Sequence, residues 1–439
     1  MKTIDKNIEW IVAIAVMMIS TFSVSSGIIN IFFPIGKSII LFSHPLLVIL
    51  LLLYQNKWYG IKLQNRTFFI FFLLYSVYIL LYITELRIYP LPLLAATPSS
   101  VEYFMYRTIL LLGYLLCAKT IYRKFNVNKF IVVSTLGCLL PTLWYVNLVG
   151  VDFLQNYGNS DDSTYIGQLT IAYSNAPLLI IAFFNFNKLF RPIILSRFVS
   201  IFIIIAVGYI LIVSTKRGPI FWSLICFIFC LYYKDKNVFK YAMTLFILTI
   251  VLYSYVDVAL DWISKIAPYS AERISRTLYE GDLTSRYDET NISGSAYVIG
   301  INQFLNSPIW GSYFRLIVSS GIFKGYYPHN IFIEVLITMG VVGFIPFILL
   351  LRKAFVNIHH VFKCQFETNQ LSCLVLFLMS FLKLQTTGSL LLYNSFWVFF
   401  YIMLCLQIFA KTEKPNKIFI QHLIARLYVP PMRKHKGKD

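Results

Sequence analysis

Runs of apolar residues recur along the whole chain, and most are about as long as a helix that crosses a bilayer. Short polar stretches carrying charges, glycine or proline separate these runs. Continuous hydrophobicity over such lengths is typical of transmembrane helices. We therefore predict an all-α polytopic membrane protein with about 12 transmembrane helices, at residues 9–27, 38–54, 67–85, 102–118, 130–149, 163–186, 198–214, 218–233, 239–258, 329–351, 370–387 and 390–410.

The predicted helices form two groups on either side of one long polar segment. Residues 1–258 would hold helices one to nine, residues 329–410 helices ten to twelve, and residues 411–439 a basic cytoplasmic tail. The segment 259–328 is far longer than an ordinary connection, which makes it a candidate functional loop. We expect this large outer (periplasmic) loop to contain short helices. One is predicted at 295–305, where apolar residues recur at helical spacing, and we expect it to lie at the outer surface of the membrane.

Composition agrees with the pattern and excludes a soluble domain. Hydrophobic residues make up 58% of the 439 residues and charged residues 13%, whereas soluble domains carry roughly 25% charged residues. The net charge of +19 comes mostly from segments that are cytoplasmic if the N-terminus is cytoplasmic. This distribution predicts that both termini are cytoplasmic and that the excess charge faces anionic lipid. We therefore expect no nucleic-acid partner.

The seven cysteines fall in apolar runs or in segments predicted to be cytoplasmic. No pair has metal-ligand spacing with histidines nearby, and no Asp-x-Asp sequence or comparable acidic pair marks a metal site. We expect neither a disulfide framework, nor a metal site, nor a cofactor.

One polar stretch opens the predicted tenth helix. Its sequence is Tyr327-Pro328-His329-Asn330-Ile331-Phe332-Ile333-Glu334. Asn330 and Glu334 are spaced to share one helix face. Polar residues that enter a bilayer are costly without partners, so a functional site is one interpretation. The other is a plain helix start, with Pro328 near the first turn, Asn330 as the cap and His329 in water.

Four cations elsewhere in the predicted helices and their connections stand out, and three of them, Lys216, Arg217 and Arg107, are candidates for binding an anion. Lys216 and Arg217 lie in the very short outer turn Ser214-Thr215-Lys216-Arg217-Gly218-Pro219, against the positive-inside bias. A guanidinium suits bidentate phosphate contact, and Gly218 permits close approach of the backbone. The alternative is that both side chains reach outer headgroups. Arg107 lies inside the fourth helix and either lines a cavity or pairs with an acid such as Glu102 or Glu334. Lys383 lies near a helix end, where reaching the membrane surface is the favoured interpretation.

Three segments resemble the O-antigen polymerase and O-antigen ligase superfamily, in the expected order. The resemblance covers roughly residues 198–351 and the overall number of helices. The segments are Ser214-Thr215-Lys216-Arg217-Gly218-Pro219, then Ala296-Tyr297 through Asn306-Ser307-Pro308-Ile309-Trp310-Gly311, then Pro328-His329-Asn330-Ile331-Phe332-Ile333-Glu334 with Gly340 and Gly343. Similar proteins carry an arginine near the position of Ser293, and none stands there. Arg286 is the nearest candidate, with Arg276 and Arg273 upstream.

The resemblance implies a metal-independent glycosyltransferase in the bacterial cytoplasmic (inner) membrane, with its active site on the periplasmic side. The donor would be an undecaprenyl-diphosphate-linked oligosaccharide, and a polysaccharide chain-length regulator is a candidate partner beside membrane lipids. Cations would stabilise the leaving diphosphate. His329 would be the general base, because histidine titrates closest to neutral pH. The implied catalytic residues are His329, Arg217 and Glu334, and the substrate-binding residues are Arg286, Lys216, Asn330, Arg107 and Arg276.

Several functions stay open on the sequence. The polymerase joins lipid-linked repeat units, whereas the ligase transfers the glycan to lipid A-core, and transfer to protein is a third variant. The segment between Pro308 and His329 is short and offers no platform for lipid A-core, which favours the polymerase. A flippase or other transporter of lipid-linked polysaccharide also fits many helices, but it would place charges near the midplane of related halves.

Overall fold

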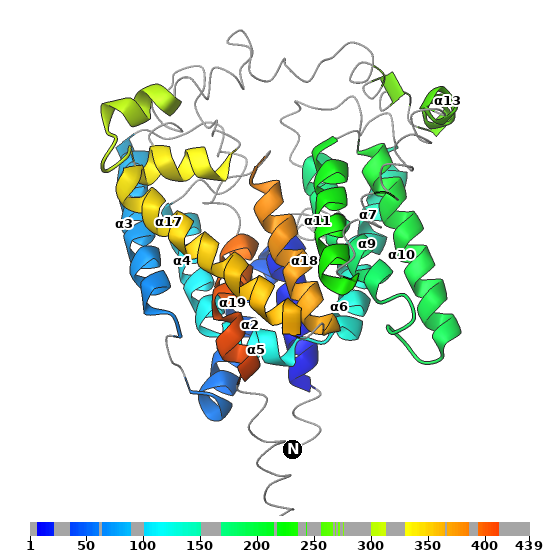
Figure 1. The fold of residues 1–439 in the computed structure, drawn as a ribbon, viewed down its shortest axis with the longest axis horizontal. Helices are drawn as coiled ribbons and strands as arrows, with labels where there is room; N and C mark the ends of the chain where they lie inside the picture. Colours follow the sequence, from blue (N-terminus) through cyan, green and yellow to red (C-terminus); the bar gives the residue numbers. More distant parts are fainter. Residues whose placement is uncertain are drawn as a thin grey trace, which may run out of the picture.

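The computed structural model describes residues 7–21, 36–60, 64–88, 101–150, 168–214, 217–235, 243, 256–266, 268, 271–272, 275, 300–312, 330–364, 367–385 and 394–411. Every regular element in these ranges is helical, which confirms the all-α prediction (Figure 1). The helices are Asn7–Thr21, α2 (Gly36–Trp58), α3 (Arg66–Ile88), α4 (Val101–Leu116), α5 (Ala118–Lys124), α6 (Val127–Ser134), the π-helix η2 (Thr135–Leu139), α7 (Leu140–Val149), α9 (Gln168–Phe184), α10 (Ile193–Val213), α11 (Arg217–Asp235), α13 (Val256–Ile266), 300–306, α17 (Ile331–Cys364), α18 (Thr368–Lys383) and α19 (Asn394–Lys411).

Three of the described helices are long and apolar enough to cross a membrane: Val127–Val149, Ile193–Val213 and Ile331–Phe362. Six shorter apolar helices accompany them. Most of the predicted helices coincide with described helices, but the predicted ninth, 239–258, and most of the predicted loop 259–328 lie outside the described residues. The structure is therefore compatible with a membrane protein.

The rod Val127–Val149 contains a π-helical turn, and the sequence supplies a physical reason for it. Pro141 has no N–H to donate, and its ring clashes with the preceding turn of a regular helix. The wider turn at Thr135–Leu139 comes just before this proline, and the Leu140 N–H reaches back to the Thr135 carbonyl. The helix axis thus continues across the proline as one rod.

Short connections make neighbouring helices antiparallel. Eight residues join α9 to α10, three join α10 to α11, and three join α17 to α18. The helices stand side by side in Figure 1, whereas α13 is seen almost end-on and so lies across them. This arrangement brings the beginnings of α11 and α17 and the end of α18 to the same end of the bundle, and we call it the Glu334 end.

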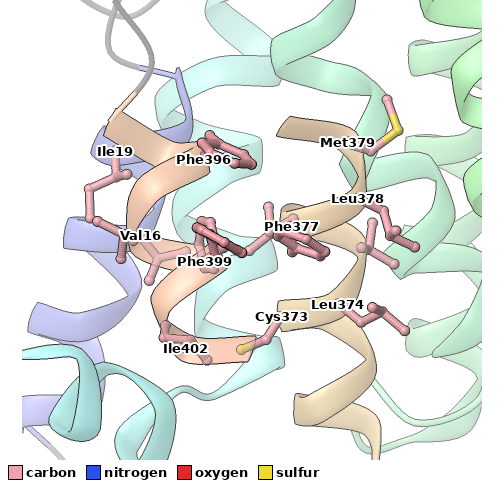
Figure 2. Packing of buried hydrophobic residues seen from close by; sticks show 14 of the residues in the cluster. Val16, Ile19, Cys373, Leu374, Phe377, Leu378, Met379, Phe396, Phe399 and Ile402 are labelled. Carbon is pink, nitrogen blue, oxygen red and sulfur yellow. The ribbon is translucent and has the colours of Figure 1, made fainter. Parts of the chain in front are cut away.

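The core is built around α19, whose side chains are buried on all faces over most of its length. Figure 2 shows Phe396 and Phe399 of α19 between Val16 and Ile19 of the first helix and Phe377 of α18. Aromatic rings dominate the contacts: Phe377 stacks on Phe400 with ring centroids 6.2 Å apart. Aromatic side chains of this size bury large apolar areas, so α19 is the helix that the others pack around.

The outer surface of the bundle is apolar along several helices. On α3 the exposed apolar residues Ile70, Leu73, Val77 and Leu80 recur every three or four positions and so form one stripe. On α10, Ile194, Phe198, Ile201 and Ile205 do the same. Stripes of this kind would be unfavourable in water and suit contact with lipid.

Candidate functional site

The structure describes only part of the predicted site. His329, Arg286, Lys216 and Arg276 lie outside the described residues. For Arg217, the first residue of α11, and Arg107 in α4, only the helical backbone is described. Asn330 and Glu334 are described in full, and both belong to the beginning of α17.

Asn330 is the N-cap of α17. Its side-chain oxygen accepts hydrogen bonds from the backbone N–H groups of Phe332 at 3.0 Å and Ile333 at 3.2 Å. The first turn of a helix lacks internal acceptors for its N–H groups, and asparagine is among the best residues to supply one. The capping interpretation of this stretch therefore holds for the Asn330 oxygen, and a role in substrate binding is left to its amide NH₂ group.

Glu334 sits one turn into α17 and is buried, with 2% of its surface exposed. Its backbone N–H donates to the Asn330 carbonyl at 2.9 Å. The ring of Phe332 in the same turn contacts the ring of Phe381 in α18, with centroids 6.0 Å apart. This contact sets the first turn of α17 beside the last turn of α18, which carries Lys383.

Lys383 is buried, and its Nζ lies 5.4 Å from the ring centroid of Tyr173 in α9. The prediction that this lysine reaches the membrane surface is therefore wrong. The physical reason for the burial is that α9 and α18 pack together. The ammonium therefore lies over an aromatic face whose quadrupole attracts a cation. The buried acid Glu334 and the buried base Lys383 thus belong to neighbouring helix turns, the first of α17 and the last of α18.

The position of Tyr173 also locates the beginning of α11. Tyr173 lies near the start of α9, and α10 runs back along α9 after a short turn. The end of α10 at Ser214 and the backbone of Arg217 are consequently at the Lys383 end of the bundle. The beginnings of α11 and α17, which carry two of the three family-like segments, therefore share the Glu334 end (Figure 1).

Helix α17 is broken at Gly340, which adopts φ 60° and ψ −163°. This region of backbone space is essentially restricted to glycine. At the break, the N–H groups of Val341 and Val342 and the carbonyl of Ile337 lose the partners that a continuous helix would give them. Buried backbone groups without partners are costly, so other groups have to replace them.

The turn 307–312 supplies these partners. The carbonyl of Pro308 accepts from Val341 N–H at 3.0 Å, and that of Ile309 accepts from Val342 N–H at 3.2 Å. In the opposite direction, the N–H of Ser312 donates to the Ile337 carbonyl at 2.7 Å, and its hydroxyl lies 3.2 Å from the same oxygen. The two ends of the break are joined through this turn, which we call the clamp.

Close approach of two glycines makes the clamp possible. A Cβ on Gly311 would overlap the backbone of Thr338 and Gly340, and a Cβ on Gly340 would overlap the carbonyl of Ile309. Both residues also have positive φ, 74° and 60°. Any other residue at either position would separate the clamp from α17.

The clamp is fixed to α3 as well. The hydroxyl of Tyr78 donates to the carbonyl of Trp310 at 2.6 Å, and the Tyr78 side chain is buried. Helices α3 and α17 also pack through Phe71 and Phe347, whose ring centroids are 6.2 Å apart. The half of α17 that carries Glu334 is therefore held by α18 and the clamp, whereas α3 holds the clamp and the half of α17 beyond Gly340.

Sequence reasoning missed two of these features. Gly311 and Gly340 were visible as glycines within the family-like segments, but nothing in the pattern indicated that they touch. Tyr78 and Tyr173 lie in apolar helices without any distinguishing signal, because their roles depend on which helices are neighbours. Among the described residues, no group of three or more His, Cys, Asp and Glu side chains is gathered in a way that could hold a metal ion.

No protein-family model matches the sequence, and comparison with curated proteins finds no match either. Function must therefore be inferred from the residues and their geometry.

Proposed function

We propose that the protein is an O-antigen polymerase-type glycosyltransferase of the cytoplasmic membrane. It would join undecaprenyl-diphosphate-linked oligosaccharide units at the outer face. The observation that carries the proposal is the clamp, because direct backbone hydrogen bonds join the family-like segment 306–311 to the part of α17 around Gly340, which belongs to another of the three family-like segments. Segments that define a common site are expected to be held together in this way.

The proposed glycosyl transfer needs one group to accept a proton from the acceptor sugar and other groups to stabilise the leaving diphosphate. An acceptor sugar hydroxyl attacks the anomeric carbon of the donor, the bond from that carbon to the diphosphate oxygen breaks, and the hydroxyl proton goes to His329. Charge develops on the leaving diphosphate. Arg217, Arg286 and Lys216 would stabilise this charge, with Arg276 and Arg107 along the binding path.

Glu334 and Asn330 would support His329 from the first turn of α17. A buried carboxylate near an imidazole favours its protonated form, which is the product of the proton transfer. Lys383 joins the candidates for the diphosphate because it is a buried cation at the Glu334 end. A buried ammonium is expensive to maintain, and such groups in apolar helices are usually retained for function.

Two other functions compete with the polymerase. A ligase would use the same chemistry with lipid A-core as the acceptor. A transporter is favoured by the broken helix α17, because discontinuous helices form the substrate sites of many transporters. However, the N–H groups freed at Gly340 are already bonded to the carbonyls of Pro308 and Ile309, so they do not offer an anion site. This weighs against the transporter.

The direct test is reconstitution in lipid nanodiscs. Lipid-diphosphate-linked repeat units are extracted from a host that lacks this protein and incubated with the purified chain. A polymerase yields lipid-linked dimers and longer chains, together with one free undecaprenyl diphosphate for each bond formed. Products that appear only when lipid A-core is added indicate the ligase. Absence of any new glycosidic bond, with Arg217→Ala and wild-type protein behaving alike, would overturn the transferase proposal.

A further inference from the structure

Helix α13 is amphipathic along its whole described length. Asp257, Asp261, Ser264 and Lys265 lie on one side of the helix, and Val258, Leu260, Trp262 and Ile263 lie on the other. Asp261 and Lys265 form an exposed ion pair at 2.8 Å, which keeps the polar side in water. This division of polar and apolar positions is typical of a helix that lies at the surface between water and an apolar phase.

Two residues on the apolar side are exposed. Val258 is 67% exposed and Trp262 is 61% exposed. These two residues are one turn apart, so they present one continuous patch. Figure 1 shows α13 nearly end-on at the Glu334 end, so that its axis crosses the bundle helices. A helix in that orientation would lie parallel to the plane of a membrane that the bundle crosses.

A second exposed tryptophan belongs to the clamp, which follows the helix 300–306. Trp310 in the clamp is 62% exposed, and Ile309 beside it is exposed too. The preceding helix, 300–306, exposes Ile301 and Leu305 one turn apart. This helix is yellow-green at the upper left of Figure 1, whereas α13 is at the upper right.

Trp310 is attached to a helix that carries part of the apolar outer surface of the bundle. Its carbonyl accepts from the Tyr78 hydroxyl, and Tyr78 is adjacent to Val77 in the exposed stripe of α3. The clamp, with its exposed Ile309 and Trp310, is therefore attached to a helix that carries one of the exposed stripes. A bilayer is the partner that would cover the exposed stripes of α3 and α10 together, and an exposed tryptophan attached to α3 suits contact with the same partner.

We propose that α13 and the clamp are interfacial membrane anchors, with Trp262 and Trp310 in the headgroup layer of the same leaflet. Tryptophan is enriched at this depth because its ring is apolar and its indole N–H can still find a hydrogen-bond partner. Anchors on both flanks fix the height of the Glu334 end relative to the lipid. The beginning of α17 would then lie at the depth of the headgroup layer, where a lipid-linked diphosphate would also lie. The proposal does not depend on glycosyl transfer.

The test measures depth by fluorescence quenching in nanodiscs of anionic and zwitterionic phospholipid. A bimane label is attached to Trp262→Cys and, as the matched control on the polar side of α13, to Ser264→Cys. Trp310→Cys and Asn306→Cys form the second pair. The six described native cysteines are buried, and unmutated protein labelled in parallel gives the background. Spin-labelled phospholipid quenches from the lipid side, and iodide quenches from water.

At both tryptophan positions, we expect spin-labelled lipid to quench the label about twofold or more strongly than at the paired control position. Iodide should quench the label more strongly at the control positions than at the tryptophan positions. Strong iodide quenching and weak lipid quenching at Trp262→Cys and Trp310→Cys would overturn the proposal. Shielding from both quenchers would also overturn it, because the patches would then be covered by protein. No glycan is involved, so this result is independent of whether the transferase assay succeeds.

Discussion

Gly311 and Gly340 lie so close together that neither position has room for a Cβ atom. Gly340 breaks α17, Gly311 lets the clamp approach the break, and the backbone groups of each segment bond to the other. Because these contacts involve backbone rather than side chains, they hold the Glu334 half of α17 at a fixed angle to the rest of the helix. The orientation of the candidate site depends on this pair.

Alanine at either glycine should destabilise the protein. Gly340→Ala has to leave a glycine-only backbone region, which costs about 1–3 kcal/mol, and it also collides with the Ile309 carbonyl. We expect the apparent unfolding midpoint to fall by several degrees in heated samples followed by size-exclusion chromatography. Gly208→Ala in α10 is the control, because nothing lies within 4 Å of its added Cβ. If all three variants unfold like the wild type, the clamp does not hold α17.

Loss of one hydroxyl should weaken the attachment of the clamp to α3. Tyr78→Phe removes the donor to the Trp310 carbonyl and leaves that oxygen without this bond. The expected loss is about 1 kcal/mol of the free energy of unfolding. Tyr209→Phe, at an exposed position on α10, is the matched change and should have little effect. Equal effects of the two substitutions would show that the Tyr78 hydroxyl contributes nothing specific.

Two substitutions of Asn330 separate capping from substrate binding. Asn330→Asp keeps an oxygen for the Phe332 and Ile333 N–H groups, and its charge suits a helix N-terminus, so the unfolding midpoint should be maintained. Asn330→Ala loses the cap and about 1 kcal/mol. If the amide NH₂ group contacts the glycan, transfer falls in both variants. Full activity in Asn330→Asp would restrict Asn330 to its capping role.

Removal of the Lys383 charge should harm activity more than stability. Lys383→Met keeps a side chain of similar length and removes the desolvation penalty of a buried ammonium. We expect an unfolding midpoint at or above that of the wild type and glycan transfer reduced about tenfold or more, equivalent to about 1.4 kcal/mol of transition-state stabilisation. Lys353→Met, exposed near the other end of the bundle, should affect neither quantity. A large loss of stability with full activity per folded molecule would make Lys383 a structural residue.

The sequence predicted features that local chemistry determines. The apolar runs located helices within a few residues: α11 begins at Arg217, next to the predicted 218, and α10 ends at Val213, next to the predicted 214. Asn306-Ser307-Pro308 does end the helix at 300–306, because proline cannot continue it without strain. These features depend on residues that are neighbours in the chain.

Features that depend on residues that are neighbours only in space could not be predicted from the sequence in the same way. Hydrophobicity is uniform across Gly340, so the pattern predicts one unbroken helix there, and the bonds that compensate the break come from the clamp. The helix also continues to Cys364, beyond the predicted end at 351, because Arg352 and Lys353 interrupt the apolar run without ending the helix. Burial of Lys383 against Tyr173 depends on the pairing of α9 with α18, which sequence periodicity does not specify.

The central claim is that His329 carries glycan polymerisation at the beginning of α17, and the surface glycan of the native host tests it most directly. His329→Ala is compared with His360→Ala, at an exposed histidine far along α17, after both variants are shown to insert in the membrane at wild-type levels. We predict that the glycan ladder of His329→Ala collapses to core plus a single repeat unit, whereas His360→Ala keeps the full ladder. A core without any repeat, together with accumulated lipid-linked polymer, would identify the ligase instead. An unchanged ladder in His329→Ala would contradict the account and reduce this stretch to a helix start.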